Sequence, residues 1–234
     1  MPLAIGSLSL SPTVPRVVAA GGESELDALA AGDAADIVEL RVDLFADPRP
    51  AALPAILDRL RAAGRPVIVT VRAASEGGRH LDDGLRRDLY AAALPHADAI
   101  DVEIASTAIA GDVVPRARAL ARTVILSAHV QDRTPPTAAL AQLATRAREL
   151  GADVPKIVTH AGGLDDLATL LGVTLAERAR GIVTLAMGPA GPLSRLALPA
   201  AGSLLTYGHV GRPTAASGQL PAAELAALLR RLVA

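Results

Sequence analysis

The sequence predicts an α/β fold in which eight strands alternate with helices along the chain. Three observations predict it: short runs rich in Val, Ile and Leu recur at regular intervals, amphipathic segments separate them, and glycines stand where those segments end. Most runs are continuously apolar, which is typical of strands covered on both faces. The predicted strands are residues 16–20, 37–45, 66–72, 99–104, 123–129, 154–160, 181–187 and 204–210.

The segments between the strands have the periodicity of amphipathic helices. Residues 51–63, for example, carry leucine or isoleucine at positions 53, 56, 57 and 60, which share one helical face. Gly64 and Gly151 stand where two of these helices end, a position that favours glycine. The predicted helices are residues 24–31, 51–63, 82–94, 113–121, 137–150, 164–171 and 222–233, with a shorter one at 192–196.

Eight such alternations in 234 residues predict a (β/α)8 TIM barrel, whose usual size is about 250 residues. A doubly wound open sheet is the alternative, but no G-x-G-x-x-G follows the first strand, as a dinucleotide-binding version would require. Residues 2–12 precede the first unit, and we expect them to form a hairpin that closes the bottom of the barrel. No linker divides the chain, so residues 1–234 are predicted to form a single domain.

Composition excludes several classes of protein. The chain has no cysteine, which excludes disulfide scaffolds, thiolate metal sites and cysteine nucleophiles. With 23 basic and 24 acidic residues and few aromatic ones, nucleic acid is not an expected partner. Although 51% of residues are hydrophobic, no apolar stretch reaches the roughly 18 residues of a membrane span. No secretory signal is recognisable at residues 1–12, so we expect a cytoplasmic protein without a membrane partner.

Charged residues alternate with apolar ones in two predicted strands. Glu39, Arg41 and Asp43 share one face of the second strand. We expect that face to point into the barrel, where charges need partners or a ligand; an exposed edge strand is the alternative. Asp101 and Glu103 share a face of the fourth strand in the same way.

The most unusual residue is Lys156, the only lysine among 23 basic residues. It lies in the Val/Ile run of the sixth strand, although lysine is rarely buried; a surface lysine with its stem against apolar neighbours is the alternative. Arginine cannot be deprotonated, whereas a lysine amine becomes a nucleophile when burial and nearby cations, such as Arg41 or Arg72, disfavour the ammonium. The composition therefore predicts a Schiff-base lysine at the centre of the barrel.

Other candidates lie at the ends of neighbouring strands. His129 ends the fifth strand and is predicted to shuttle protons, because imidazole titrates near neutral pH; a structural histidine is the alternative. Arg195 lies in a loop after the seventh strand and is suited to binding a carboxylate. Residues 211–219 are rich in small residues and are interpreted as a mobile lid, with an ordinary surface loop as the alternative.

Taken together, these residues resemble the type I 3-dehydroquinate dehydratases. Each matching block is short, but seven occur in order over nearly the whole chain. They are Glu39-Leu-Arg41-Val-Asp43, Thr70-Val-Arg72 with Glu76-Gly-Gly, Ile100-Asp-Val-Glu103, Ser127-Ala-His129, Ala152-Asp-Val-Pro-Lys156-Ile, Ser194-Arg195-Leu and Gly218-Gln219. The resemblance implies a (β/α)8 barrel, usually a homodimer, that uses no metal or cofactor. It also implies the syn elimination of water from 3-dehydroquinate, giving 3-dehydroshikimate.

The resemblance assigns roles to individual residues. Lys156 would form an imine with the C3 ketone, His129 would carry the C2 proton to the departing C1 hydroxyl, and Glu76 would orient this histidine. Arg195 would bind the substrate carboxylate, with Gln219 and the lid closing over it. The ring hydroxyls would be held by Glu39, Arg41 and Arg72.

The chain departs from the family pattern at a few positions. The last loop of the family usually reads Ser-Ala-Pro-Gly-Gln, whereas residues 215–219 read Ala-Ala-Ser-Gly-Gln, so the lid hydroxyl would come from Thr214 or Ser217. The first strand ends in two alanines where the family often has a serine that touches the substrate. Tyr207 stands where phenylalanine is frequent, and Met187 matches an apolar wall residue.

Two other functions are considered. One is a class I Schiff-base aldolase acting on a small keto acid or sugar phosphate, which would usually have a phosphate cradle after strands seven and eight; residues 188–191 mimic one weakly. The other is an inactive barrel kept as a binding module, which the presence of Glu76, His129 and Lys156 disfavours.

Overall fold

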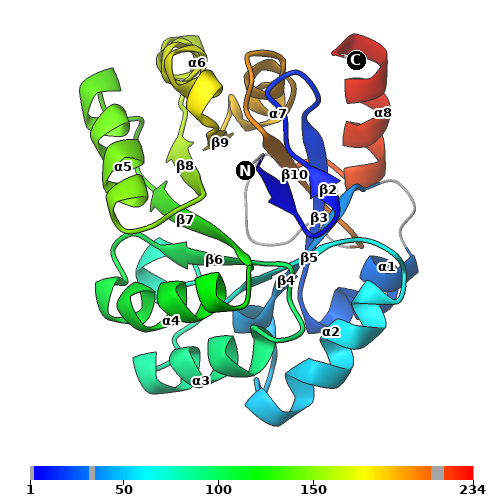
Figure 1. The fold of residues 1–234 in the computed structure, drawn as a ribbon. Helices are drawn as coiled ribbons and strands as arrows, with labels where there is room; N and C mark the ends of the chain where they lie inside the picture. Colours follow the sequence, from blue (N-terminus) through cyan, green and yellow to red (C-terminus); the bar gives the residue numbers. More distant parts are fainter. Residues whose placement is uncertain (1–2, 32–34, 212–218, 234) are drawn as a thin grey trace.

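The computed structural model describes residues 3–31, 35–211 and 219–233. Eight parallel strands form a nearly closed barrel with helices around the outside (Figure 1), which confirms the predicted fold class. Around the barrel the order is β10-β3-β4-β5-β6-β7-β8-β9. The strands are β3 (Arg16–Gly21), β4 (Ile37–Arg41), β5 (Val67–Thr70), β6 (Ala99–Glu103), β7 (Thr123–Val130), β8 (Val154–His160), β9 (Val183–Met187) and β10 (Leu205–His209).

The outer layer contains the helices that return the chain to the bottom of the barrel. They are α1 (Leu26–Ala31), α2 (Leu53–Arg61), α3 (Asp83–Ala93), α4 (Thr107–Ala119), α5 (Thr137–Glu149), α6 (Leu164–Glu177), α7 (Gly191–Ala200) and α8 (Ala222–Leu232). Three are longer than predicted: α4 begins six residues earlier, α6 continues to Glu177 and α7 extends to Ala200. Proline is tolerated in the first turn of a helix but is uncommon in its interior. Because Pro115 and Pro199 lie inside α4 and α7, the boundaries of these two helices were hard to predict from the sequence. Within the described ranges, no helix combines the length and apolar character that crossing a membrane would require.

The barrel has one seam. Seven neighbouring strand pairs form regular parallel ladders, but no such ladder joins β9 to β10 in the described chain. Instead, the Leu204 N–H donates to the Ile182 carbonyl at 2.9 Å, and the Thr184 N–H donates to Ser203 Oγ at 3.0 Å. A serine side chain thus satisfies a backbone donor at the β9–β10 seam that a neighbouring strand would otherwise satisfy.

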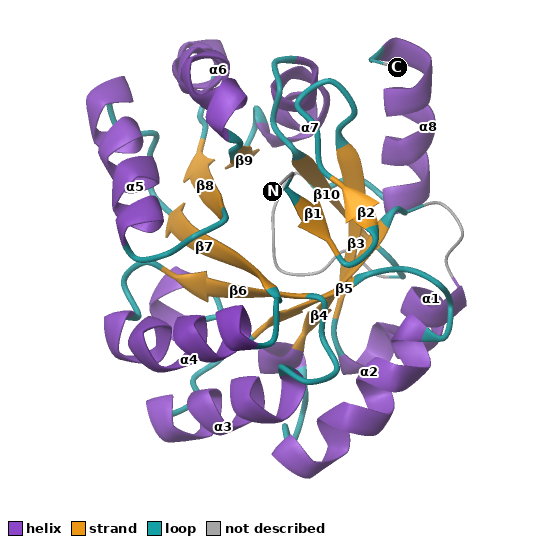
Figure 2. Cartoon of the chain, viewed as in Figure 1, coloured by secondary structure: helices purple, strands orange, loops and turns teal. Residues whose placement is uncertain are grey.

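A short hairpin covers the N-terminal end of the barrel (Figure 2). Its strands are β1 (Ala4–Ile5) and β2 (Leu8–Ser9), paired antiparallel. Ile5 is completely buried against residues of the barrel interior, and Thr123 Oγ1, at the start of β7, donates a hydrogen bond to the Ala4 carbonyl. The hairpin therefore closes the barrel bottom, as predicted.

Along several strands the interior face changes from apolar to polar. Because alternate residues share a face, Ile37 at the bottom of β4 is followed by Glu39, and Val154 at the bottom of β8 is followed by Lys156. The lower layer is a cluster of buried aliphatic side chains under the hairpin. The layer above holds the charged groups, with Glu39 only 3% exposed, so the alternative of an exposed edge strand is wrong.

Candidate active site

A cavity opens at the C-terminal ends of the strands, where barrels of this type collect functional groups. It encloses about 620 Å³, open solvent included. Eight of the ten predicted site residues line it: Glu39, Arg41, Arg72, Glu76, His129, Lys156, Arg195 and Gln219. The other two, Thr214 and Ser217, lie outside the described residues, as does most of the predicted lid.

Lys156 lies on the interior face of β8 and is only 3% exposed, so the alternative of a surface lysine is wrong. Its Nζ is 2.8 Å from Asp101 Oδ2 and 3.7 Å from Glu39 Oε1. It also lies 4.0 Å from the centre of the Tyr207 ring, which is within the range of a cation–π contact. Of the two expected arginine neighbours, Arg72 pairs with the same Asp101 oxygen at 3.0 Å, whereas Arg41 pairs with Asp43.

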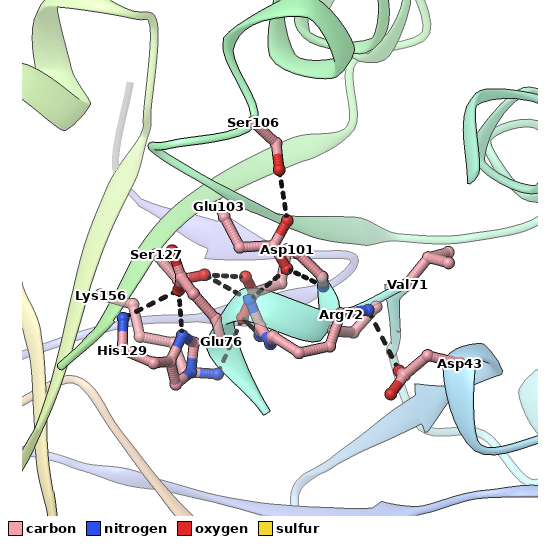
Figure 3. Close-up of polar contacts among 12 residues, drawn as sticks. Asp43, Val71, Arg72, Glu76, Asp101, Glu103, Ser106, Ser127, His129 and Lys156 are labelled. Carbon is pink, nitrogen blue, oxygen red and sulfur yellow. Dashed lines mark hydrogen bonds and ion pairs between the residues drawn. The ribbon is translucent and has the colours of Figure 1, made fainter. Parts of the chain in front are cut away.

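Asp101 links Lys156 to a buried polar network (Figure 3). It accepts a hydrogen bond from Ser127 Oγ at 2.5 Å and pairs with Arg72 at 3.0 Å. Burial alone would raise the pKa of the Asp101 carboxyl, but Arg72 and Lys156 outweigh burial and hold this pKa well below its ordinary range. The carboxyl is therefore ionised at any working pH, and its charge compensates the lysine.

Arg72 is fixed from several sides. Its guanidinium donates to Glu103 Oε1 at 2.9 Å and to Ser127 Oγ at 2.7 Å, and Glu103 in turn binds Arg86 at 2.5 Å. Burial lowers the pKa of Arg72, but Asp101 and Glu103 outweigh burial and raise it well above its ordinary value. Arg72 is thus a permanent, rigidly held cation at the cavity wall.

Asp43 departs from the prediction. The strand β4 ends at Arg41, and Asp43 lies in a 3-10 turn at Val42–Leu44, so it is not on the strand face shared by Glu39 and Arg41. It is fully buried, accepts two hydrogen bonds from Arg41 at 2.8 and 2.7 Å and one from the Arg72 N–H at 3.1 Å. Asp43 therefore orients two cavity residues without lining the cavity.

His129 and Glu76 form a close pair. Glu76 Oε2 lies 2.8 Å from His129 Nδ1 and also accepts a hydrogen bond from the His129 backbone N–H at 2.8 Å. Burial lowers the pKa of His129 well below its ordinary value, and the neighbouring cations Arg72 and Lys156 lower it further. The imidazole is consequently neutral near pH 7. With Nδ1–H donating to Glu76, its Nε2 is left unprotonated and able to accept a proton.

Glu76 itself is presented by a tight turn after β5. The turn Ala74–Glu76 is followed by Gly77 at a φ of +88°, a left-handed conformation that favours glycine. A side-chain carbon on Gly78 would lie 2.0 Å from the Arg72 carbonyl oxygen, so only glycine fits there. Burial raises the pKa of Glu76 to about 7, which makes this carboxyl a group that titrates near neutral pH.

Arg195 lies in the second turn of α7, which contains the short helix predicted at residues 192–196, and not in a loop. It is 2% exposed, its Nη2 donates to the Ala186 carbonyl at 3.3 Å, and its Nε has no partner among the described residues. Burial lowers the pKa of Arg195 to about 10, so it remains charged at neutral pH. Since no described carboxylate pairs with it, it is a buried cation available to an anion.

Several groups were not assigned to the site from the sequence. Gln131, Val158 and Leu185 line the cavity, and nothing in their sequence context distinguishes them. For Asp101 the signal was available, because it alternates with Glu103 in the fourth strand as charged residues of the second strand do. Ser127, which bridges Asp101 and Arg72, gave no such signal.

An eight-stranded parallel barrel with buried charges around a cavity at its C-terminal end defines the class of (β/α)8-barrel enzymes. The family model for type I 3-dehydroquinase matches residues 17–233. The chain belongs to this family, whose members are hydro-lyases.

Curated relatives and solved structures support the same family assignment. The chain is 36% identical over 229 residues to the 3-dehydroquinate dehydratase of Methanocella arvoryzae, covering 93% of this chain and 97% of the relative. It is 35% identical over 216 residues to that of Methanosarcina acetivorans, covering 87% and 88%. The crystal structure of the type I enzyme from Clostridium difficile, solved with covalently modified comenic acid, superimposes with a TM-score of 0.90 at 28% identity over 99% of this chain and 98% of that one.

Proposed function

We propose that this protein converts 3-dehydroquinate into 3-dehydroshikimate and water through a Schiff base on Lys156. The observation that carries the proposal is the position of the only lysine of the chain, buried at the cavity wall 2.8 Å from a permanently ionised carboxylate. The names of the curated relatives support the substrate. The covalently modified comenic acid in the structure of the C. difficile enzyme supports covalent chemistry in this family.

In the first step, the Lys156 amine attacks the C3 ketone after its ammonium proton has passed to His129 Nε2. The protonated histidine returns this proton to the oxygen of the carbinolamine, which leaves as water. An iminium remains, with the positive charge that the ammonium had before. Asp101 compensates this charge throughout, so the step requires no new counterion.

In the second step, neutral His129 removes the C2 proton, and the electron pair moves into the iminium to give an enamine. The enamine then expels the C1 hydroxyl, which takes the proton from the imidazolium and leaves as water. Hydrolysis of the conjugated iminium releases 3-dehydroshikimate and regenerates the amine. Glu76, paired with Nδ1, stabilises the imidazolium that forms in between.

The substrate is held by charges at the rim. The unpaired Arg195 guanidinium binds the carboxylate. Ring hydroxyls are hydrogen-bonded by Glu39, Arg41 and Arg72, and Gln219 closes the cavity. Thr214 or Ser217 would supply a further hydroxyl from the lid.

The aldolase alternative lacks support at the position where a phosphate would bind. The N–H groups of Ala190 and Gly191 already donate to the carbonyls of Ala161 and Gly188, at 3.2 and 2.9 Å. Neither donor is therefore available to a phosphate in the turn after β9.

Borohydride trapping tests the proposal. We expect sodium borohydride added with 3-dehydroquinate to inactivate the enzyme and leave one adduct on Lys156, located by peptide mass spectrometry. Lys156→Ala should form no adduct and have no measurable turnover. His129→Ala should lose about 10²- to 10⁴-fold in turnover, the usual range for general acid–base catalysis, yet still accumulate some adduct.

Turnover that survives in Lys156→Ala, with no adduct in the wild type, would refute the imine. As a control, the enzyme is treated with borohydride in the absence of substrate, which should leave its activity intact. The homodimer implied by the family resemblance and the cytoplasmic location expected from the sequence of residues 1–12 stay predictions; sedimentation velocity of the purified protein tests the first.

A further inference from the structure

Tyr207 has a buried hydroxyl without a hydrogen-bond partner. The residue lies on the interior face of β10, lines the cavity and is 3% exposed. Its oxygen contacts no donor or acceptor among the described residues. A phenol that is buried normally finds a partner for its O–H, because leaving it unpaired costs free energy. An unpaired hydroxyl at the wall of a polar cavity therefore indicates that its partner is a ligand.

A second unpaired donor lies close to it. The Nε of Arg195 is buried and also has no partner among the described residues. Thr206, directly before Tyr207, donates from its Oγ1 to the Arg195 carbonyl at 3.0 Å, which fixes α7 to β10. The Arg195 guanidinium and the Tyr207 hydroxyl also interact electrostatically. Two buried donors without partners among the described residues thus line the same cavity, on two elements that are in contact.

The ring of Tyr207 lies beside the lysine, with its centre 4.0 Å from Lys156 Nζ. Burial raises the pKa of Tyr207 well above its ordinary value, and Glu39 and Asp101 raise it further. The hydroxyl consequently stays protonated at working pH and acts as a donor. A carboxylate fits this pair best, because its two oxygens can accept from the hydroxyl and the guanidinium while its charge compensates the arginine.

We infer that the Tyr207 hydroxyl and the Arg195 guanidinium together bind the carboxylate of the substrate, which makes Tyr207 a substrate-binding residue that determines specificity. The inference rests on the proposed function, because that function supplies the carboxylate. One side chain then spans the substrate: its hydroxyl holds the carboxylate end while its ring lies against the nitrogen that forms the imine.

The test is Tyr207→Phe, which removes one oxygen and keeps the ring. We expect the KM for 3-dehydroquinate to rise about tenfold or more, the usual effect of losing a hydrogen bond to a charged group, while kcat changes by less than about threefold. Borohydride trapping on Lys156 should still occur. Affinity for the product 3-dehydroshikimate should fall by a similar factor, whereas affinity for its methyl ester should be the same in both proteins.

A stability measurement separates binding from structure. Because the hydroxyl has no partner among the described residues, urea unfolding should show Tyr207→Phe to be at least as stable as the wild type. The double variant Tyr207→Phe with Arg195→Lys should also be measured. Its fold-loss in affinity for 3-dehydroshikimate should be smaller than the product of the fold-losses of the two single variants, because both donors act on one carboxylate.

Unchanged KM and product affinity in Tyr207→Phe would overturn the inference. A loss of stability alongside the loss of affinity would overturn it as well, because the hydroxyl would then have a structural partner. An inactive wild type that forms no adduct would instead refute the proposed function. The two failures are therefore distinguishable.

Discussion

At the scale of residues, four buried or half-buried cations line the cavity in the described part of the chain, and one of these four lacks a carboxylate partner there. Arg41 pairs with Asp43, while Arg72 and Lys156 share Asp101. The unpaired cation is Arg195. An incoming anion is therefore directed to Arg195, and the lysine is left to react with an uncharged carbonyl.

The pKa of Glu76 gives a pH-dependent contribution to stability. Burial raises it from 4.5 to about 7, so the fold favours the protonated carboxyl. The contribution is fully present below pH 4.5 and is lost as the pH rises through about 7. The Glu76→Gln variant has no titrating group at this position, so its stability does not fall in this way as the pH rises. Between pH 5 and pH 8 we expect this variant to gain roughly 2 kcal/mol relative to the wild type, measured as the free energy of unfolding in urea.

The same variant should lose turnover at pH 8, where the wild-type Glu76 is ionised, because a neutral amide stabilises the imidazolium poorly. At pH 5 the wild-type carboxyl is itself protonated, so the loss should be smaller. If the free energy of unfolding changed with pH in the same way in both proteins, burial of Glu76 would not be the cause, because its carboxylate would then titrate equally in the folded and unfolded states.

At the scale of elements, the turn after β5 controls the catalytic pair through its glycines. Gly78→Ala would place a carbon 2.0 Å from the Arg72 carbonyl oxygen, so either β5 or the turn must shift. We expect a loss of about 1–3 kcal/mol in unfolding free energy, as for other overpacked sites, and at least a tenfold loss of turnover as Glu76 moves away from His129. Circular dichroism melts and steady-state kinetics measure both.

Gly111→Ala is the matched control. Gly111 lies inside α4, and a side-chain carbon there would meet no atom within 4 Å. The same change should therefore be neutral or stabilise by about 0.5–1 kcal/mol, with unchanged kinetics. A tolerant Gly78→Ala would show that the turn can relax without moving Glu76.

The strands were predictable from the sequence because their Val/Ile runs are buried on both faces, and each predicted run overlaps an observed strand. Side chains on regular strands, such as Glu39 and Lys156, could also be placed from periodicity. Asp43 could not, because the chain leaves the strand after Arg41 and the alternation stops. The neighbours of Lys156 were not predictable either, since they come from other strands and depend on the closure of the barrel.

At the scale of the whole molecule, the two ends of the barrel have separate tasks. The hairpin and the aliphatic layer under the charged groups stabilise the fold, and the C-terminal ends of the strands carry the residues of the cavity. Ile5→Ala should therefore cost about 2–5 kcal/mol in unfolding free energy, as for other fully buried aliphatic residues, with KM and kcat close to wild type at temperatures where the variant is folded.

Urea unfolding and kinetics at 20 °C check this separation. Leu232→Ala, at a side chain that is 63% exposed, should change stability by less than about 0.5 kcal/mol. A large rise in KM in Ile5→Ala would show that the bottom of the barrel also shapes the cavity.

The fact that Lys156 is the only lysine of the sequence has a practical consequence. Protein grown with ¹⁵N in the lysine side-chain nitrogen carries the label at a single atom, the Nζ that faces Asp101. Its nuclear magnetic resonance spectrum would contain one signal, and conversion of the amine into an imine would move that signal far from its starting position. The enzyme thus contains its own spectroscopic reporter, and each intermediate on the nitrogen can be followed without a mutation or an added probe.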